Sequence, residues 1–188
     1  MHSKEVLGEG KYYRMVKAKG WEYVEPVGFS DVVLIIPVTD DGRMVLIEQY
    51  RVPADKQVFE IPAGLVGDKE HIKDENIIEA ARRELIEETG YDAKNITIAI
   101  KAAPNAGSNT LEVHMLLATG LKKVGNGGGN PEEGENIKVY EVPLAHVRTW
   151  LNDKIAHGHV VDLKVYAGLF FAMEYWNEHQ NALDGHNR

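Results

Sequence analysis

Apolar residues along this chain recur mostly with the spacing of β-strands. The run at residues 32–36 is apolar at every position, which is typical of a strand buried on both faces. It lies in a strand predicted at residues 31–38, and Asp40-Asp41-Gly42 is a hairpin signal leading to a second strand at 43–50. Further strands are predicted at 11–19, 21–26, 58–61, 95–101, 111–119 and 137–142, and helices at 77–89, 144–152 and about 162–179. Strands interleaved with a few helices predict an α/β fold.

The helix at residues 77–89 has clear end signals. Asn76 and Glu79 have the spacing of a capping box at its start, and Gly90 is placed to end it in a left-handed conformation. At about 100° per residue, one apolar arc should face the core. This arc consists of Ile77, Ile78, Ala81 and Leu85.

Three glutamates lie where this helix should meet the core. Glu84 and Glu88 fall on the edge of the apolar arc, with Glu87 just beyond Glu84. Carboxylates held side by side at a core boundary repel one another and lose hydration, so an ordinary helix would not gain from them. Divalent cations remove this cost, and oxygen ligands without His or Cys suit Mg²⁺ or Mn²⁺. Arg83 can pair with Glu79 and Glu87. The alternative is a solvated helix rich in ion pairs.

The same stretch resembles the Nudix box, the signature of hydrolases that cleave a nucleoside diphosphate linked to another moiety. That signature runs from a glycine, through a glutamate, to R-E-aliphatic-x-E-E-x-G-hydrophobic. Ten residues separate Gly64 from Glu75 where the family has five, so we expect an extra surface loop within residues 67–73. The residues that match with the usual spacing are Glu75, Arg83, Glu84, Leu85, Glu87, Glu88, Gly90 and Tyr91.

Within this family the chain is most similar to ADP-ribose pyrophosphatases and related hydrolases of nucleoside diphosphate sugars. The short matches follow one another along most of the chain and include Trp21-Glu22, residues 48–51, residues 60–64, Glu133-Gly134-Glu135 and residues 161–166. The resemblance implies four metal ligands, namely the Ala63 carbonyl and the side chains of Glu84, Glu87 and Glu88. It implies the substrate-binding residues Trp21, Arg51, Glu60 and Gly64, and the catalytic residues Glu135, Glu133, Glu87 and Arg83.

Several of these implied roles have plain structural alternatives. Trp21 would stack on the base across a dimer interface, or it is a buried tryptophan of a small sheet. Arg51 would clamp phosphate with its fork of donors, or it is a surface arginine at a strand end. Glu135, with Glu133 as second choice, would be the base or a metal-linked carboxylate, or both belong to a solvated acidic loop.

Two further segments contain residues that could suggest ligand binding. The glycine-rich residues 125–130 lack the Lys-Ser/Thr pair and helix start of a phosphate-binding loop. We interpret them as a hinge for a mobile loop carrying Glu132, Glu133 and Glu135, whose closure brings a carboxylate to the attacking water. His157 and His159 are interpreted as part of a turn, because no further ligand is suitably spaced for a metal.

Composition bounds the class of protein. A chain of 188 residues with 44% hydrophobic content predicts one domain, over residues 1–188, with a substantial core. The formal charge of −8 argues against nucleic-acid binding, which needs a basic face. No apolar run is long enough for a bilayer, and the first residues lack the hydrophobic segment of a secretory signal, so a cytoplasmic location is expected. The absence of cysteine agrees with a reducing compartment.

The resemblance implies a Nudix fold, an α/β/α sandwich around a mixed sheet. Strands within about residues 1–28 should add a small antiparallel extension, whose aromatic side chains exceed what two short strands can bury and so favour a homodimer. The expected activity is Mg²⁺-dependent hydrolysis of ADP-ribose or a related nucleoside diphosphate sugar to a nucleoside monophosphate and a sugar phosphate. Alternatives are a preference for GDP-mannose or another nucleotide sugar, and a non-catalytic module that senses nucleotide.

Overall fold

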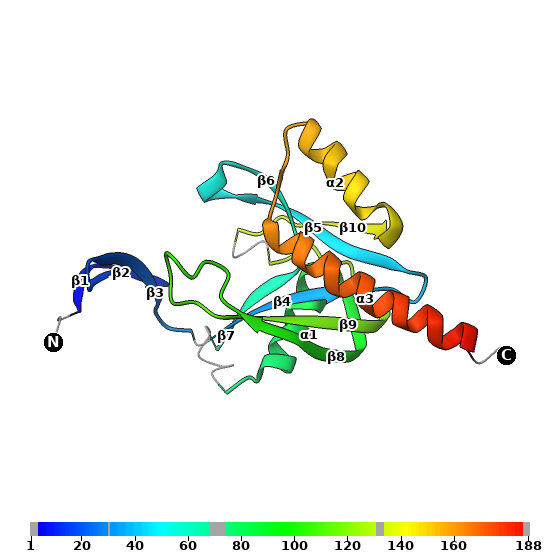
Figure 1. The fold of residues 1–188 in the computed structure, drawn as a ribbon. Helices are drawn as coiled ribbons and strands as arrows, with labels where there is room; N and C mark the ends of the chain where they lie inside the picture. Colours follow the sequence, from blue (N-terminus) through cyan, green and yellow to red (C-terminus); the bar gives the residue numbers. More distant parts are fainter. Residues whose placement is uncertain (1–3, 30, 68–73, 131–133, 186–188) are drawn as a thin grey trace.

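Two four-stranded sheets form the body of the protein, and a three-stranded sheet projects from it (Figure 1). The computed structural model describes residues 4–29, 31–67, 74–130 and 134–185. We call the sheets the first, the second and the N-terminal sheet. The first has the order β7 (Ala63–Val66), β4 (Asp31–Pro37), β9 (Val113–Lys123) and β8 (Tyr91–Ala102). The second has the order β10 (Lys138–Pro143), β5 (Arg43–Arg51), β6 (Lys56–Glu60) and β11 (Val160–Val161).

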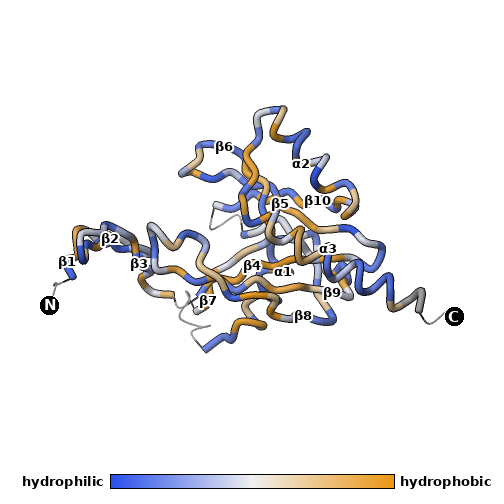
Figure 2. Tube along the Cα trace, viewed as in Figure 1, coloured by the Kyte–Doolittle hydropathy of each residue, from blue (hydrophilic) through white to orange (hydrophobic). Residues whose placement is uncertain are grey.

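Strand β4 lies at the centre of the first sheet and is covered on both faces. It pairs parallel with β9 and antiparallel with β7, so the sheet is mixed. Val33 and Ile35 pack in the core beneath helix α1 (Ile77–Thr89), whereas Leu34 and Ile36 belong to the larger core beneath α3 (Leu163–Gly185). The apolar colour of β4 in Figure 2 reflects this double burial, which confirms the prediction made from the continuous apolar run.

The predicted hairpin between β4 and β5 is wrong in its pairing. The turn forms, since Gly42 N donates to Thr39 O at 3.0 Å, but the strands share only the bridge between Val38 and Met44. They then enter different sheets. The physical reason is that β7 and β9 occupy both edges of β4, while β10 and β6 occupy both edges of β5.

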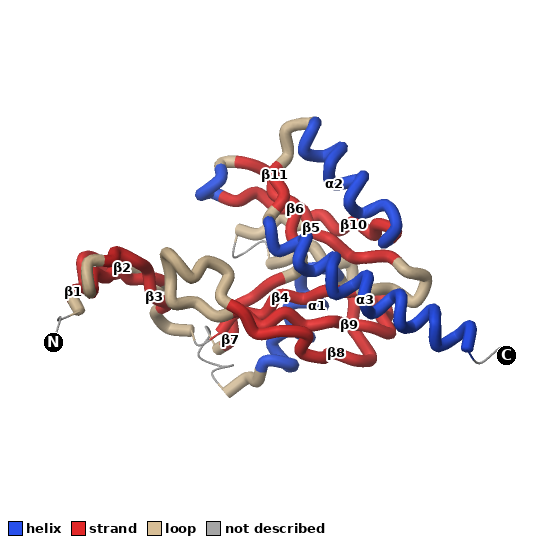
Figure 3. Tube along the Cα trace, in the orientation of Figure 1, coloured by secondary structure: helices blue, strands red, loops and turns tan. Residues whose placement is uncertain are grey.

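The N-terminal sheet consists of β1 (Glu5–Glu9), β2 (Tyr13–Ala18) and β3 (Trp21–Pro26), all antiparallel. Strand β1 was not predicted. The sheet reaches the body through the long β8–β9 loop (Figure 3). There, Val24 N donates to Ser108 O at 2.9 Å, and Thr110 N donates to Val24 O at 3.1 Å.

The remaining elements follow the sequence with small differences. Strands β7 and β11 were not predicted, and the helix predicted at 144–152 is a 3₁₀ turn (Leu144–His146) followed by α2 (Val147–Ala156). A short 3₁₀ helix, Val52–Ala54, joins β5 to β6. Among the helices of the described residues, none has both the length and the apolar character needed to cross a membrane. The α/β class with an antiparallel N-terminal extension is confirmed, although the strands form two mixed sheets rather than one.

Candidate active site

Helix α1 has the ends that its sequence predicts. The Asn76 side chain accepts hydrogen bonds from Ile78 N at 2.9 Å and Glu79 N at 3.0 Å, and Glu79 accepts one from Asn76 N at 3.0 Å. At the other end, Gly90 has a φ of 73° and its N–H donates to Ile86 O. Both ends are therefore fixed, and the glutamates between them project from a rigid element.

These glutamates differ strongly in exposure. Glu88 is buried, with 3% of its surface exposed, and its Oε2 accepts from Ala63 N at 3.0 Å. The side chain of Glu84 is 15% exposed and that of Glu87 is 44% exposed. The order matches the predicted arc, in which Glu84 and Glu88 lie at the edge of the core and Glu87 lies outside it.

Burial makes ionisation of the two inner glutamates costly. It raises the pKa of Glu84 to about 7, against the lowering effect of Arg83 and with smaller raising effects from the charges of Glu87 and Glu135. Burial also raises the pKa of Glu88 well above its usual range, and the neighbouring Glu84 charge adds to this. A cation near both carboxylates would reverse these effects, because opposite charge favours the ionised form.

Arg83 organises the outer side of the cluster. Its guanidinium lies 2.9 Å from Glu75, 2.7 Å from Glu84 and 3.5 Å from Glu87. Burial would lower the Arg83 pKa, but the hydrogen bond to Glu75 and the charge of Glu84 raise it. The predicted pairing with Glu87 is present, whereas the predicted pairing with Glu79 is wrong because Glu79 closes the capping box instead. Arg83 thus holds three carboxylates.

Strand β7 brings Ala63 and Gly64 against the glutamates. A Cβ atom at position 64 would lie 2.0 Å from the Glu84 Cδ, so any other residue there would displace the Glu84 carboxylate from this position. Ala63 N already binds Glu88, which places the backbone beside the same carboxylates. The extra loop expected within residues 67–73 lies almost wholly outside the described residues.

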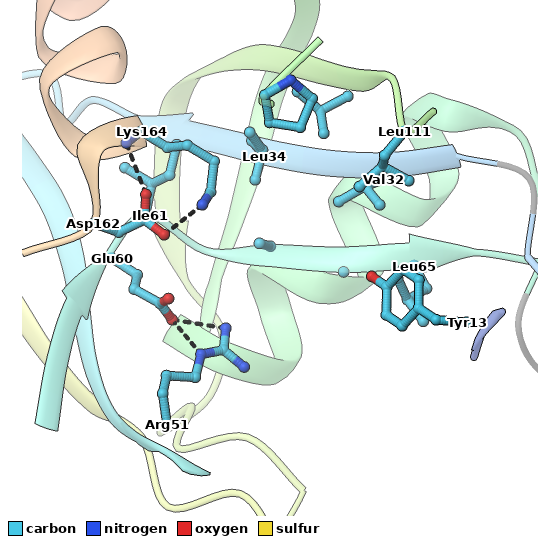
Figure 4. A pocket seen from close by; sticks show the side chains of 14 residues that line it. Tyr13, Val32, Leu34, Arg51, Glu60, Ile61, Leu65, Leu111, Asp162 and Lys164 are labelled. Atoms are coloured by element: carbon cyan, nitrogen blue, oxygen red, sulfur yellow. Dashed lines mark hydrogen bonds and ion pairs between the residues drawn. The ribbon is translucent and has the colours of Figure 1, made fainter. Parts of the chain in front are cut away.

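Arg51 and Glu60 form an ion pair at the edge of a pocket of about 330 Å³ (Figure 4). Arg51 Nε and Nη2 donate to the same Glu60 oxygen at 2.8 and 2.7 Å, and Gln49 donates to it at 3.0 Å. Burial lowers the pKa of Arg51, but the hydrogen bond and charge of Glu60, together with the charges of Glu88 and Glu135, outweigh burial and raise that pKa. Arg51 also lines a neighbouring pocket with Glu135. It is therefore a fixed cation between two pockets, as well as a residue at a strand end.

The pocket of about 330 Å³ is also lined by three residues that were not selected as site residues from the sequence. Asp162 and Lys164 form an ion pair at the charged end, across from Arg51 (Figure 4). Tyr13 from strand β2 lines the apolar end. One signal was available, because a lysine in the first turn of α3 opposes the helix dipole, which favours anions there. Nothing local in the sequence indicates Tyr13.

Glu135 lies close enough to raise the pKa of both Glu84 and Glu88. Its own carboxylate accepts from Asn130 N at 2.8 Å. The glycine-rich segment predicted as a hinge is hydrogen-bonded to the body in this structure, because Gly128 N and Gly129 N donate to carbonyls at the end of α1. Glu132 and Glu133 lie outside the described residues, so the choice between Glu133 and Glu135 stays a prediction.

Trp21 is separate from these groups. It is 63% exposed, which excludes the alternative of a buried tryptophan in the single chain. Trp21 lines its own pocket with Tyr23 and Asn109. The predicted turn at His157 and His159 is confirmed, with Gly158 between them at a φ of 88°.

The donor set of this site suits a hard divalent cation. Within the described residues, no three acidic or histidine side chains already converge as metal ligands. The residues nevertheless fit such an ion, because buried carboxylates and a nearby backbone carbonyl are the oxygen donors that Mg²⁺ accepts. In the structure, Arg83 donates a hydrogen bond to Glu84 Oε1, and Ala63 N donates one to Glu88 Oε2. A bound cation would compete with these donors for the carboxylates.

Comparison with known proteins gives consistent relationships. Residues 28–161 match the NUDIX domain. The chain is 33% identical over 130 residues to a methanol dehydrogenase activator of Bacillus methanolicus, covering 69% of this chain and 67% of that protein. It is 35% identical over 120 residues to an ADP-ribose pyrophosphatase of Bacillus subtilis, covering 64% of this chain and 62% of that protein. The chain therefore spans less than two thirds of the second relative.

The fold has a solved counterpart. The crystal structure of an ADP compounds hydrolase superimposes with a TM-score of 0.70 and 22% identity, covering 95% of this chain and 93% of that one. At that identity the match concerns the fold alone, and it agrees with the two mixed sheets and the covering helices described above.

Proposed function

We propose a function from one premise: the chain belongs to the Nudix family, whose domain spans residues 28–161. It is a Nudix pyrophosphohydrolase, and we propose that it cleaves the pyrophosphate of ADP-ribose or a related nucleoside diphosphate sugar. The products would be a nucleoside monophosphate and a sugar phosphate. The substrate class is supported by the name of the Bacillus subtilis relative and by the charged pocket beside α1.

The observation that carries this proposal is the burial of Glu88 beside Glu84. A carboxylate that is 3% exposed and accepts from one backbone N–H destabilises the protein unless a cation compensates it. We assign Glu84, Glu87, Glu88 and the Ala63 carbonyl as the groups that would hold Mg²⁺, or Mn²⁺ in its place. When bound, such a cation neutralises pyrophosphate oxygens and lowers the pKa of a water molecule.

The remaining residues bind and orient the substrate. Arg51 presents its guanidinium to a phosphate, and Glu60 keeps that guanidinium in place. Gly64 leaves space for Glu84, and Arg83 orients Glu84 and Glu87. Glu135 takes the proton from the attacking water, which forms the new bond to phosphorus as the bridging oxygen leaves with the other phosphate. Charge repulsion between carboxylates and pyrophosphate excludes this reaction without cations.

The direct experiment incubates the full-length protein with ADP-ribose and Mg²⁺, followed by product analysis. We expect AMP and ribose 5-phosphate, with no turnover in the presence of a chelator. A parallel panel should contain GDP-mannose, other nucleotide sugars and other ADP-containing compounds. Such a panel is needed because the glutamates would contact only metal and phosphates and so cannot select the sugar or the base. Efficient turnover of one other compound with poor turnover of ADP-ribose would make that compound the substrate instead. Tight ADP-ribose binding without any AMP would favour a nucleotide sensor.

Trp21 and the oligomeric state complete the proposal. We propose a homodimer in which exposed Trp21 stacks on the base at the subunit interface. The support is the apolar surface that the N-terminal sheet leaves exposed, including Val6, Met15 and Trp21. Light scattering that finds a monomer would remove this role of Trp21. The single-domain assignment and the cytoplasmic location stay predictions from the sequence.

A further inference from the structure

The end of α1 has an unusual source of hydrogen-bond partners. The last four carbonyls of an α-helix lack partners within the helix. Here Ile86 O accepts from Gly90 N at 2.9 Å, as in an ordinary left-handed cap. The next three carbonyls accept from one segment at residues 123–129, which we call the glycine strap. They pair as Glu87 O with Gly129 N at 3.1 Å, Glu88 O with Gly128 N at 2.9 Å, and Thr89 O with Lys123 Nζ at 2.9 Å.

The strap lies against the helix backbone at distances that only glycine permits. A Cβ atom on Gly127 would lie 2.4 Å from Thr89 C and 2.7 Å from Glu88 O. Gly127 also has a φ of 68°, a conformation that other residues rarely adopt. Glycine is therefore required here for close packing, in addition to its freedom of rotation.

The same strap contacts Glu135. A Cβ atom on Gly129 would lie 2.6 Å from Glu135 Oε2 and 2.9 Å from Glu135 Cβ. The next residue, Asn130, donates its N–H to that carboxylate at 2.8 Å, and Glu135 N returns a hydrogen bond to Asn130 O at 3.2 Å. Ile137 N adds a bond to Gly128 O at 3.0 Å. One peptide segment thus touches both the metal-binding helix and the proposed base.

We propose that Gly127, Gly128 and Gly129 are positioning residues that fix Glu135 relative to Glu84, Glu87 and Glu88. Peptide groups that bind the carbonyls of Glu87 and Glu88 make the metal ligands and the base move as one body. This inference rests on the proposed function, because it assigns a geometric role to the same base. It adds that the glycine strap sets the efficiency of the chemical step, while substrate binding depends on other residues.

The first test substitutes Gly129→Ala, whose added Cβ atom meets Glu135 and Ile137 as its nearest neighbours, rather than an atom of α1. We expect kcat to fall by roughly a hundredfold, since a displacement of about 1 Å in a reacting group can cost that much, while KM stays unchanged. The matched control is Gly158→Ala, because Gly158 has a φ of 88° and a Cβ atom added there would meet nothing within 4 Å beyond its chain neighbours. The control should keep its kcat, and both variants should have similar thermal midpoints. Wild-type kcat in Gly129→Ala would overturn the proposal.

A double-mutant cycle separates positioning from a general structural effect. If Gly129 acts through Glu135, the Gly129→Ala change should lower kcat in the wild type but add no further loss in Glu135→Gln. Multiplying losses would overturn the positioning role and leave the proposed function intact. A Glu135→Gln protein with wild-type kcat would instead remove Glu135 from the proposed mechanism, which is a separate failure.

A measurement without substrate or metal tests the strap itself. The amides of Gly128 and Gly129 should exchange with solvent as slowly as those of the last turn of α1, because they are bonded to that turn. Gly127→Ala should accelerate both, since its Cβ atom cannot fit against Thr89. Rapid exchange of both amides in the wild type, typical of an unprotected loop, would overturn the proposal whatever the substrate is.

Discussion

Buried glutamates occur in two regions of this protein, and their surroundings differ. On the second sheet, Glu48 is 2% exposed, accepts from Tyr140 Oη at 2.8 Å, and lies 3.0 Å from His159 Nδ1 and 3.5 Å from Lys138 Nζ. On α1, Glu88 is equally buried and accepts a hydrogen bond from Ala63 N, and the charges of Glu84 and Glu135, which raise its pKa, oppose the smaller effect of Arg51. Burial of a carboxylate is therefore no mark of function by itself.

The balance of partners distinguishes the two regions. Lys138, the His159 ring and the Tyr140 hydroxyl surround Glu48, so the protein alone supplies partners for its charge. Burial and the hydrogen bond to Glu48 raise the pKa of Tyr140 to about 12, which keeps that hydroxyl a donor. Around Glu84 and Glu88 the described groups leave negative charge in excess, and the pKa of both is raised. This incomplete charge balance is what the proposed Mg²⁺ would complete.

The strongest way to break this comparison is Glu88→Gln. The metal should then stabilise the transition state less, by about 4 kcal/mol, so kcat should fall on the order of a thousandfold. The metal-free variant should unfold at the same or a higher temperature, because a neutral amide is cheaper to bury. Substrate turnover in saturating Mg²⁺ and thermal unfolding in chelator measure the two effects. Retention of most of the activity would contradict the metal site.

Glu48→Ala should have the opposite signature. The change costs about 3 kcal/mol, because the Tyr140 hydroxyl loses its acceptor and Lys138 and His159 lose their carboxylate partner. The free energy of unfolding from urea titration should fall by that amount, while kcat of the folded protein stays at the wild-type value. A loss of kcat without a loss of stability would place Glu48 in the chemistry and remove the contrast.

Mg²⁺ itself should sharpen the difference. At a concentration about one hundred times its Kd, it should raise the unfolding free energy by about 2.7 kcal/mol through preferential binding to the folded state. Glu48→Ala should gain the same amount, and Glu88→Gln should gain little. Thermal unfolding with and without Mg²⁺ measures all three proteins. Equal stabilisation of Glu88→Gln would mean that the ion binds elsewhere.

The smallest effect is expected at Glu60. Its charge is balanced by the ion pair with Arg51, as the charge of Glu48 is balanced by its partners, but Glu60 also lines the pocket. In Glu60→Gln a neutral oxygen holds the guanidinium less firmly, a loss of about 1.5 kcal/mol. KM should rise about tenfold with a smaller change in kcat, as measured by steady-state kinetics. The matched control is Glu112→Gln, which should leave KM unchanged because Glu112 pairs with Lys101 at 2.8 Å on the exposed surface. An unchanged KM in Glu60→Gln would mean that Arg51 needs no support from this ion pair.

Local signals account for what the sequence predicted well. Each end of α1 is set by residues within about one turn of it, Asn76 with Glu79 at the start and Gly90 at the end, so these signals do not depend on distant parts of the chain. The greater exposure of Glu87 than of Glu84 and Glu88 follows from the helical period, whereas the difference between Glu84 and Glu88 was not predicted. By contrast, the partners of β4 and β5 depend on which edges other strands occupy, and the sequence of a strand does not encode its neighbours.

The parts of the site that the sequence did not reveal come from long-range packing. Strand β7 is short and contains Gly64, which weakens the strand signal, although that glycine exists to admit Glu84. Asp162 and Lys164 come to line the same pocket as Arg51 only when the start of α3 packs against the sheets. The glycines at residues 127–129 could indicate either a flexible backbone or close packing against another segment. Only the position of the α1 backbone decides between these two interpretations.

The attachment of the N-terminal sheet has a consequence for how such enzymes diversify. The region that matches the NUDIX domain begins at residue 28, after the last residue of β3, and Val24 ties the sheet to the body by backbone bonds. Backbone bonds tolerate nearly any side chain, so mutations can accumulate in β1–β3 without disturbing the reaction centre. Tyr13 and Trp21 can therefore be replaced during evolution, and the ligand preference can change while the glutamates of α1 stay the same.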